Sequence, residues 1–127
     1  MNSTLLVAAG CLTIIVGLVH SVLGEVLIFR RMRNGGLIPT QGSPILRERH
    51  VRILWASWHV VSVFGWALGA ILLRLSSSSS EFALPAFIAY TVLVAMTAAS
   101  LLVLVGTKGM HPGWVGLLGV AVLILLA

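Results

Sequence analysis

The feature that most constrains this chain is the stretch from Ile45 to Leu75, in which a cluster of arginines is followed by an apolar run. Arg47, Arg49 and Arg52 stand in its first turns, and the apolar run that follows is broken mainly by His59. A helix needs roughly 20 predominantly apolar residues to cross a bilayer. The stretch therefore predicts a transmembrane helix that begins at a basic loop.

One side of that helix collects its polar and aromatic side chains. Residues three and four positions apart share a helix face, and stepping in this way along the stretch gives a single polar stripe. The opposite side is made of Val, Ile, Leu and Ala. We expect the stripe to face protein and the opposite side to face lipid. The stripe consists of Arg52, Trp55, His59, Ser62, Trp66 and Gly69.

The composition indicates an integral membrane protein. Of the 127 residues, 59% are hydrophobic and 9% are charged, whereas a soluble domain carries about 25% charged residues. The mean hydropathy is +1.11. The formal net charge of +5 comes mostly from arginines around one loop, so it indicates how the chain is oriented in the membrane. It excludes a nucleic-acid-binding protein, because nucleic acid binds to a basic surface on a folded soluble domain. Cys11, the only cysteine, cannot form an internal disulfide and is interpreted as a small buried residue.

Four apolar runs predict an all-α fold, an integral membrane antiparallel four-helix bundle with four transmembrane helices. We expect a single domain over residues 1–127, because the long apolar runs recur through the whole length and leave no room for a second domain. The last run measures only ~24 Å at 1.5 Å per residue, slightly less than the ~30 Å hydrocarbon core. The predicted spans cover residues 4–29, 51–73, 82–105 and 112–127.

The basic residues predict the orientation of these spans. All of them except Arg74 lie in or beside the first and third loops. Short arginine-rich loops stay in the cytoplasm, so both termini are expected outside it, in a membrane such as the bacterial inner membrane. The bilayer is the expected partner, and anionic lipid headgroups are expected to bind six arginines: Arg30, Arg31, Arg33, Arg47, Arg49 and Arg52.

Two histidines form the candidate site. His20 lies about ten residues before the cytoplasmic end of the first span, and His59 lies about eight residues after the start of the second. Their depths are therefore similar, and consecutive helices usually pack as neighbours. We expect both imidazoles to face a common interior point. Glu25 lies nearer the interface, where Arg52 or another arginine of the first loop can pair with it.

One face of the first span carries small residues, at positions Gly10, Thr13, Gly17 and Gly24, together with His20. Small residues at this spacing allow another helix to approach the backbone closely. They also leave room for a flat ligand such as haem, which tryptophans of the second span would line. Glycine alone does not separate these two interpretations.

Polar residues elsewhere have plain structural explanations. Serine and threonine side chains can satisfy backbone carbonyls or bond across helices, so the polar side of the third span is expected to face the bundle. His50 and His111 are expected near the cytoplasmic surface as polar interfacial residues. The polar side of the third span consists of Tyr90, Thr97, Ser100 and Thr107.

No motif identifies a reaction, because HExxH, CxxC, a nucleotide-binding glycine loop and a nucleophile elbow are all missing from the sequence. Three classes stay open. In the first, His20 and His59 bind haem or copper for redox chemistry, with Glu25 as a further metal ligand. In the second, the protein is a small transporter, channel or accessory subunit, a homo-oligomer whose polar cavity is lined by the same three residues. The third is a scaffold with buried polar contacts.

The stretch Gly17–Gly24, with the sequence GLVHSVLG, resembles the first-helix histidine segment of copper-resistance and haem-dependent oxidase membrane families. The resemblance covers under a tenth of the chain. The tryptophan-glycine pattern that follows in those families is missing here, so no residue role is carried over from them.

Overall fold

The computed structural model of this protein describes residues 3–77 and 83–127, and within these ranges every regular element is a helix. The all-α prediction is confirmed for this part of the chain. The predicted start of the third span, at residue 82, lies outside the described residues. The four α-helices are α1 (Ser3–Leu23), α2 (Glu48–Ser76), α3 (Leu84–Gly106) and α4 (Gly113–Leu126).

The first helix changes its winding before it ends. α1 continues directly into a π-helix, η1 (Gly24–Ile28), and then into a 3-10 helix, η2 (Phe29–Met32). Together the three elements form one rod of 30 residues. A π-helical turn inside an α-helix is rare and is frequently found at functional sites.

Three of the described helices are long and apolar enough to cross a membrane. They are the rod Ser3–Met32, α2 and α3. α4 is also apolar but has 14 residues, or ~21 Å at 1.5 Å per residue. The structure thus has the helices expected of an integral membrane protein, with three of the four at full spanning length.

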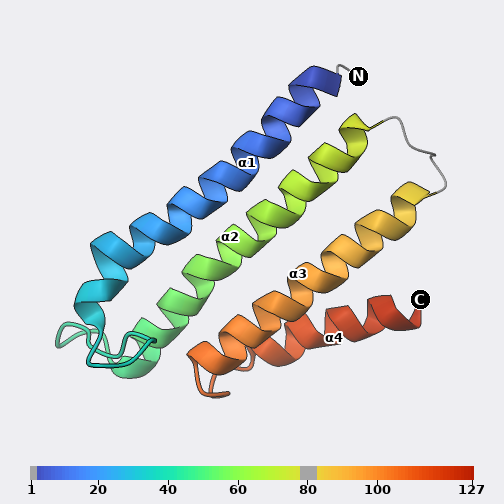
Figure 1. The fold of residues 1–127 in the computed structure, drawn as a ribbon. Helices are drawn as coiled ribbons and strands as arrows, with labels where there is room; N and C mark the ends of the chain where they lie inside the picture. The colour runs from blue at the N-terminus through green and yellow to red at the C-terminus, as the bar shows by residue number, and fades with distance from the viewer. Residues whose placement is uncertain (1–2, 78–82) are drawn as a thin grey trace.

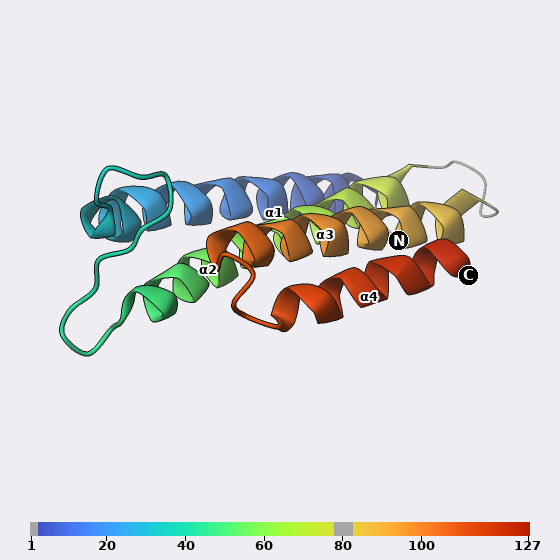
Figure 2. The same ribbon diagram turned by 90° about the horizontal axis from the view of Figure 1, so that it is seen from below.

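The helices pack mainly against their neighbours in sequence: α1 against α2, α2 against α3, and α3 against α4. Figure 1 shows α1, α2 and α3 side by side, with the chain turning back at each connection. Figure 2 shows α4 along one side of α3. Within the described ranges, the first and last helices share no extensive contact. The arrangement is an open row of helices, and the first and third interhelical loops, 33–47 and 107–112, lie at one end of it, which we call the loop end.

The protein-facing stripe predicted on α2 is confirmed. Most of its members are buried, and the side chain of His59 is only 15% exposed. On the opposite side of the helix, Leu54 and Leu68 are exposed, as expected of a lipid-facing surface. The buried members are Arg52, Trp55, Ser62 and Gly69.

The small-residue face of α1 receives large side chains from α2. A Cβ atom added at Gly17 would lie 2.6 Å from Nε1 of Trp66, and one added at Gly10 would lie 2.8 Å from Cγ of Leu73. At Gly24 the indole of Trp58 occupies the corresponding space. Helix packing therefore accounts for this face.

Two polar ties hold α3 to its neighbours. The buried guanidinium of Arg52 donates from Nη1 to the Gly106 carbonyl (3.0 Å) and from Nε to Glu48 Oε1 (2.8 Å). A cation at a helix C-terminus satisfies an unpaired carbonyl and interacts favourably with the helix dipole. The Ser100 hydroxyl donates to the Trp114 carbonyl (2.8 Å) and so joins α3 to α4.

Two expectations about individual residues are wrong. Cys11 is exposed, because within the described residues α2 is the helix against which α1 packs extensively, and most of the α1 surface lies outside that contact. Tyr90 is exposed as well, although Ser100 and Thr107 of the same predicted side are buried. Tyr90 lies near the start of α3, and an amphipathic aromatic ring near a helix end is typical of a membrane–water interface.

Candidate functional site

The polar side chains of α1 and α2 meet at His59, whose two ring nitrogens both have partners. Nε2 lies 3.0 Å from Oε1 of Glu25, and Nδ1 lies 2.9 Å from the hydroxyl of Ser21. The Ser21 hydroxyl lies 2.8 Å from that of Ser62, which is buried. These four residues form one hydrogen-bonded chain, which we call the His59 cluster.

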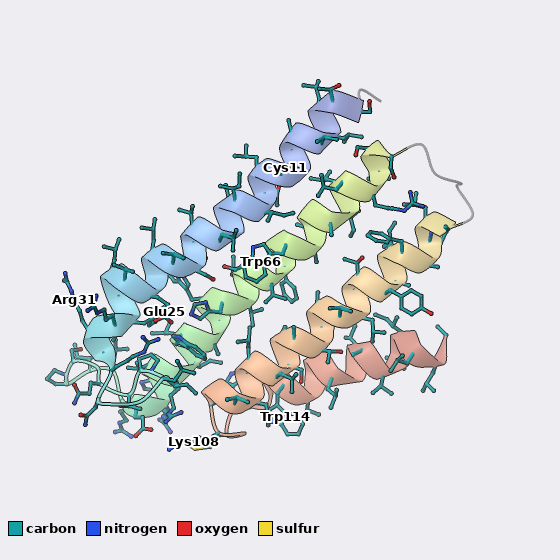
Figure 3. All side chains as sticks on the ribbon, viewed as in Figure 1. Cys11, Glu25, Arg31, Trp66, Lys108 and Trp114 are labelled. Atoms are coloured by element: carbon teal, nitrogen blue, oxygen red, sulfur yellow. The ribbon has the colours of Figure 1, made fainter. Side chains whose placement is uncertain are left out.

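The winding of the first rod places Ser21 and Glu25 on either side of the imidazole. The two residues are four positions apart, so they share a helix face. Glu25 belongs to the π-helical turn η1, and Figure 3 shows it at the seam between α1 and α2. Gly24, beside it, allows the indole of Trp58 to reach the backbone. The sequence contains the four-residue spacing, but it gives no sign of the π-helical turn.

The Glu25 carboxylate is held by three donors from different parts of the chain. Trp55 Nε1 donates to Oε1 at 2.6 Å, His59 lies at the same oxygen, and Arg33 forms an ion pair with Oε2. The Glu25 and Arg33 side chains are 26% and 25% exposed. A carboxylate at this depth needs a paired charge and hydrogen bonds. The predicted pairing with an arginine of the first loop is confirmed, with Arg33 as the partner.

The same atomic positions accommodate His59 with or without its second proton. In the neutral form, Nε2–H donates to Glu25 and Nδ1 accepts from the Ser21 hydroxyl. In the protonated form, Nδ1–H donates to Ser21, whose hydroxyl then donates to Ser62. The two hydrogen-bond patterns differ only in the orientation of the serine hydroxyls.

His20 has different neighbours. Its ring stacks on Trp58, with ring centroids 4.3 Å apart and an angle of 7° between planes. Trp58 Nε1 donates to the His20 carbonyl at 3.0 Å. Within the described residues, the buried Nε2 of His20 has no hydrogen-bond partner. The structure thus brings Glu25 and His59 into contact, and it is Ser21, next in sequence to His20, that bonds to His59.

Haem or copper ligation by His20, His59 and Glu25 stays a prediction. Among residues 3–77 and 83–127, no group of three or more His, Cys, Asp or Glu side chains is placed to hold a metal ion. The space beside Gly17 and Gly24 is taken by two indoles, which a haem ring at this face would need to displace. The observed contacts favour a hydrogen-bonding role for the cluster.

Comparisons with protein-family models, curated proteins and solved structures find no match to this chain. No relative therefore assigns a role to any of these residues. The function of the His59 cluster has to be argued from its own geometry and chemistry.

The predicted lipid-binding arginines divide into two groups. Arg33 and Arg52 have carboxylate partners within the protein, Glu25 and Glu48. The other four side chains are exposed at the loop end, and Figure 3 shows Arg31 and Lys108 there. Arg52 pairs with Glu48 four residues earlier in α2, and Arg33 reaches back from the first loop to Glu25. The exposed four are Arg30, Arg31, Arg47 and Arg49.

Proposed function

We propose that this protein is a small multi-pass membrane protein of the transport or channel class, in which the His59 cluster binds and passes protons. The observation that supports this proposal is the imidazole of His59, held at one nitrogen by Glu25 and at the other by Ser21. Imidazole exchanges protons readily near neutral pH. Chains of carboxylate and histidine inside membranes are typical of proton relays in pumps and transporters.

The geometry of the cluster supports a path that begins at the loop end. Glu25 is partly exposed and paired with Arg33 of the loop, whereas Ser62 at the other end of the cluster is buried. Next along the same seam, Trp66 fills the space at Gly17. The cluster therefore spans the part of the seam nearer the loops, and we propose that the protein acts as a homo-oligomer. The open glycine positions Gly116 and Gly119 of α4 suit that homo-oligomer.

For the orientation, we propose an antiparallel four-helix arrangement in a bacterial inner membrane, with the loop end in the cytoplasm and both termini outside. Both interhelical loops at the loop end carry basic residues, which fits the rule that such loops stay in the cytoplasm. The exposed Arg30 and Arg31 then lie at the level of anionic lipid headgroups.

Proton flux into liposomes tests the proposed function. Purified protein is reconstituted with an internal pH-sensitive dye, and a potassium gradient with valinomycin supplies the driving potential. His59→Gln keeps the size and hydrogen bonding of the side chain but cannot carry a proton. We expect it to lower the flux about 100-fold, the lower end of what a positioned proton-transfer group contributes.

His20→Gln is the matched control, because it removes an imidazole of the same helix pair that lies outside the His59 cluster. We expect its flux to equal that of the unmodified protein. Equal flux from the unmodified protein, from His59→Gln and from empty liposomes would refute the proposal. A Soret absorption band that disappears in both His20→Ala and His59→Ala would support haem binding instead.

A further inference from the structure

A cavity of about 660 Å³ opens at the loop end, between the start of α2 and the loop that joins α3 to α4. It lies apart from the His59 cluster and shares no residue with it. Arg47, Arg49 and His50 line it from the side of α2, and Lys108 and His111 line it from the loop. Two segments far apart in the sequence therefore direct basic side chains at one space.

The charges around this cavity do not cancel. Four cationic side chains and one carboxylate, Glu48, line it, which leaves a formal excess of three positive charges with the histidines neutral. Glu48 accepts a hydrogen bond from Arg52 at 2.8 Å and lies 3.8 Å from Lys108 Nζ. Among the described residues, Arg47 and Arg49 have no carboxylate partner. The cavity thus has positive charge available for an anion.

The hydrogen bonds of the two histidines leave one ring N–H of His111 as a donor for a ligand. Arg49 Nε donates to Nε2 of His50 at 3.2 Å, so that histidine already has a partner. The Gly113 amide donates to Nδ1 of His111 at 3.1 Å, and Nδ1 is therefore unprotonated. The proton of the neutral His111 ring then lies on Nε2, where it can be donated to an anion.

We propose that this cavity binds a phosphate group, carried by an anionic phospholipid or by a soluble phosphate. Guanidinium groups match phosphate oxygens with two parallel hydrogen bonds. Basic pockets between membrane helices on the cytoplasmic side are typical sites for phospholipid headgroups. The apolar side chains of Ile53 and Met110 also line the space and suit the glycerol part of a lipid. This inference is independent of the proposed proton function.

Binding to the purified full-length chain in neutral detergent tests the proposal. The probes are short-chain phosphatidylglycerol, phosphatidylcholine with the same acyl chains, and inorganic phosphate. We expect saturable binding of phosphatidylglycerol and much weaker binding of phosphatidylcholine. Competition by millimolar inorganic phosphate would identify the phosphate group alone as the ligand, whereas binding of the lipid without such competition would identify the phospholipid. Both results support the site.

Two double variants that each remove two positive charges distinguish binding in the cavity from general attraction of the anionic lipid to a basic protein. Arg47→Gln with Arg49→Gln is expected to weaken phosphatidylglycerol binding about 25-fold, at about fivefold for each basic residue. Arg30→Gln with Arg31→Gln removes two exposed arginines outside the cavity and is expected to have less than about a third of that effect.

A single substitution in the loop between α3 and α4 tests the same cavity in case the Arg47 and Arg49 double variant does not fold. The Lys108 side chain is 65% exposed, so Lys108→Gln leaves the fold intact, and we expect about fivefold weaker binding. Equal weakening by the two double variants would overturn the proposal, as would unchanged binding in Lys108→Gln. Equal affinity for the two lipids, with no binding of inorganic phosphate, would also overturn it.

Discussion

Replacing Gly17 with alanine tests whether α1 and α2 are held together by the insertion of indole rings against glycines. The new Cβ atom would lie 2.6 Å from Nε1 and 2.8 Å from Cδ1 of Trp66. Favourable contacts between such atoms lie at about 3.5–4.0 Å. The indole therefore has to move by roughly 1 Å, and the helices separate or the ring leaves its preferred rotamer.

Two opposing contributions determine how much Gly17→Ala changes the free energy of unfolding. Overpacking of this kind typically costs about 1–3 kcal/mol, whereas replacing glycine by alanine inside a helix contributes up to about 1 kcal/mol of stability. Gly65→Ala in α2 is the matched control, because nothing lies within 4 Å of the new Cβ atom there. The two variants share the helix term, so Gly17→Ala should be less stable than Gly65→Ala by about 1–3 kcal/mol.

The measurement is reversible unfolding in mixed micelles with increasing sodium dodecyl sulfate, followed by tryptophan fluorescence. The emission of Trp66 should also shift in Gly17→Ala, because the substitution displaces that indole. Equal stability of the two alanine variants, with unchanged emission, would show that the contact between Gly17 and Trp66 does not hold the helices together. The assignment of the small-residue face of α1 to helix packing would then fail.

Two further predictions concern the carboxylates and the orientation. Glu25→Gln should lower the free energy of unfolding by about 1–3 kcal/mol, since three donors lose an ionised acceptor. Glu48→Gln should leave the free energy of unfolding within error, because the Glu48 side chain is 52% exposed. The same micelle titration measures both variants, and equal losses would contradict an effect of burial. In a Cys11→Ser background, Arg31→Cys should react with an impermeant maleimide only after lysis of intact cells, and Ser77→Cys should react before it. The opposite pattern would reverse the proposed orientation.

Helical periodicity was sufficient to predict the buried face of α2. Arg52, Trp55, Ser62 and Gly69 are all buried, because α2 has extensive contacts with both α1 and α3. The same reasoning is weaker for α1, which has one extensive helix neighbour. A narrow contact surface leaves most of that helix exposed, and Cys11 lies on the exposed part.

The partner of His59 shows where reasoning from sequence stops. Counting from His20 places Glu25, five residues later, about 140° away around the helix. Counting from Ser21 places Glu25 on the same face, four residues later. The choice depends on the rotation of α1 against α2, which the fit of Trp58 and Trp66 against the α1 glycines fixes. That fit depends on side-chain shape, which periodicity does not describe.

The contacts of Arg52 combine a local pair with Glu48, four residues earlier in α2, and a contact with the end of α3 that no local pattern locates. Arg52 and Arg33 are both plausible partners for Glu25 from the sequence, but the Arg52 guanidinium binds Glu48 and the Gly106 carbonyl. The carbonyl is available because α3 ends at Gly106, and a helix end leaves such acceptors unpaired. Arg33 is then the arginine that reaches Glu25.

The division of charge between the two carboxylates explains why the loop end and the His59 cluster are chemically different sites. Glu25 is surrounded by donors, is paired with Arg33 and shares a hydrogen bond with His59. Glu48 neutralises only one of four cations around the cavity. The first arrangement suits a mobile proton, and the second suits a bound anion. Both arrangements include residues of α2, with Glu48 in its first turn and His59 three turns further along.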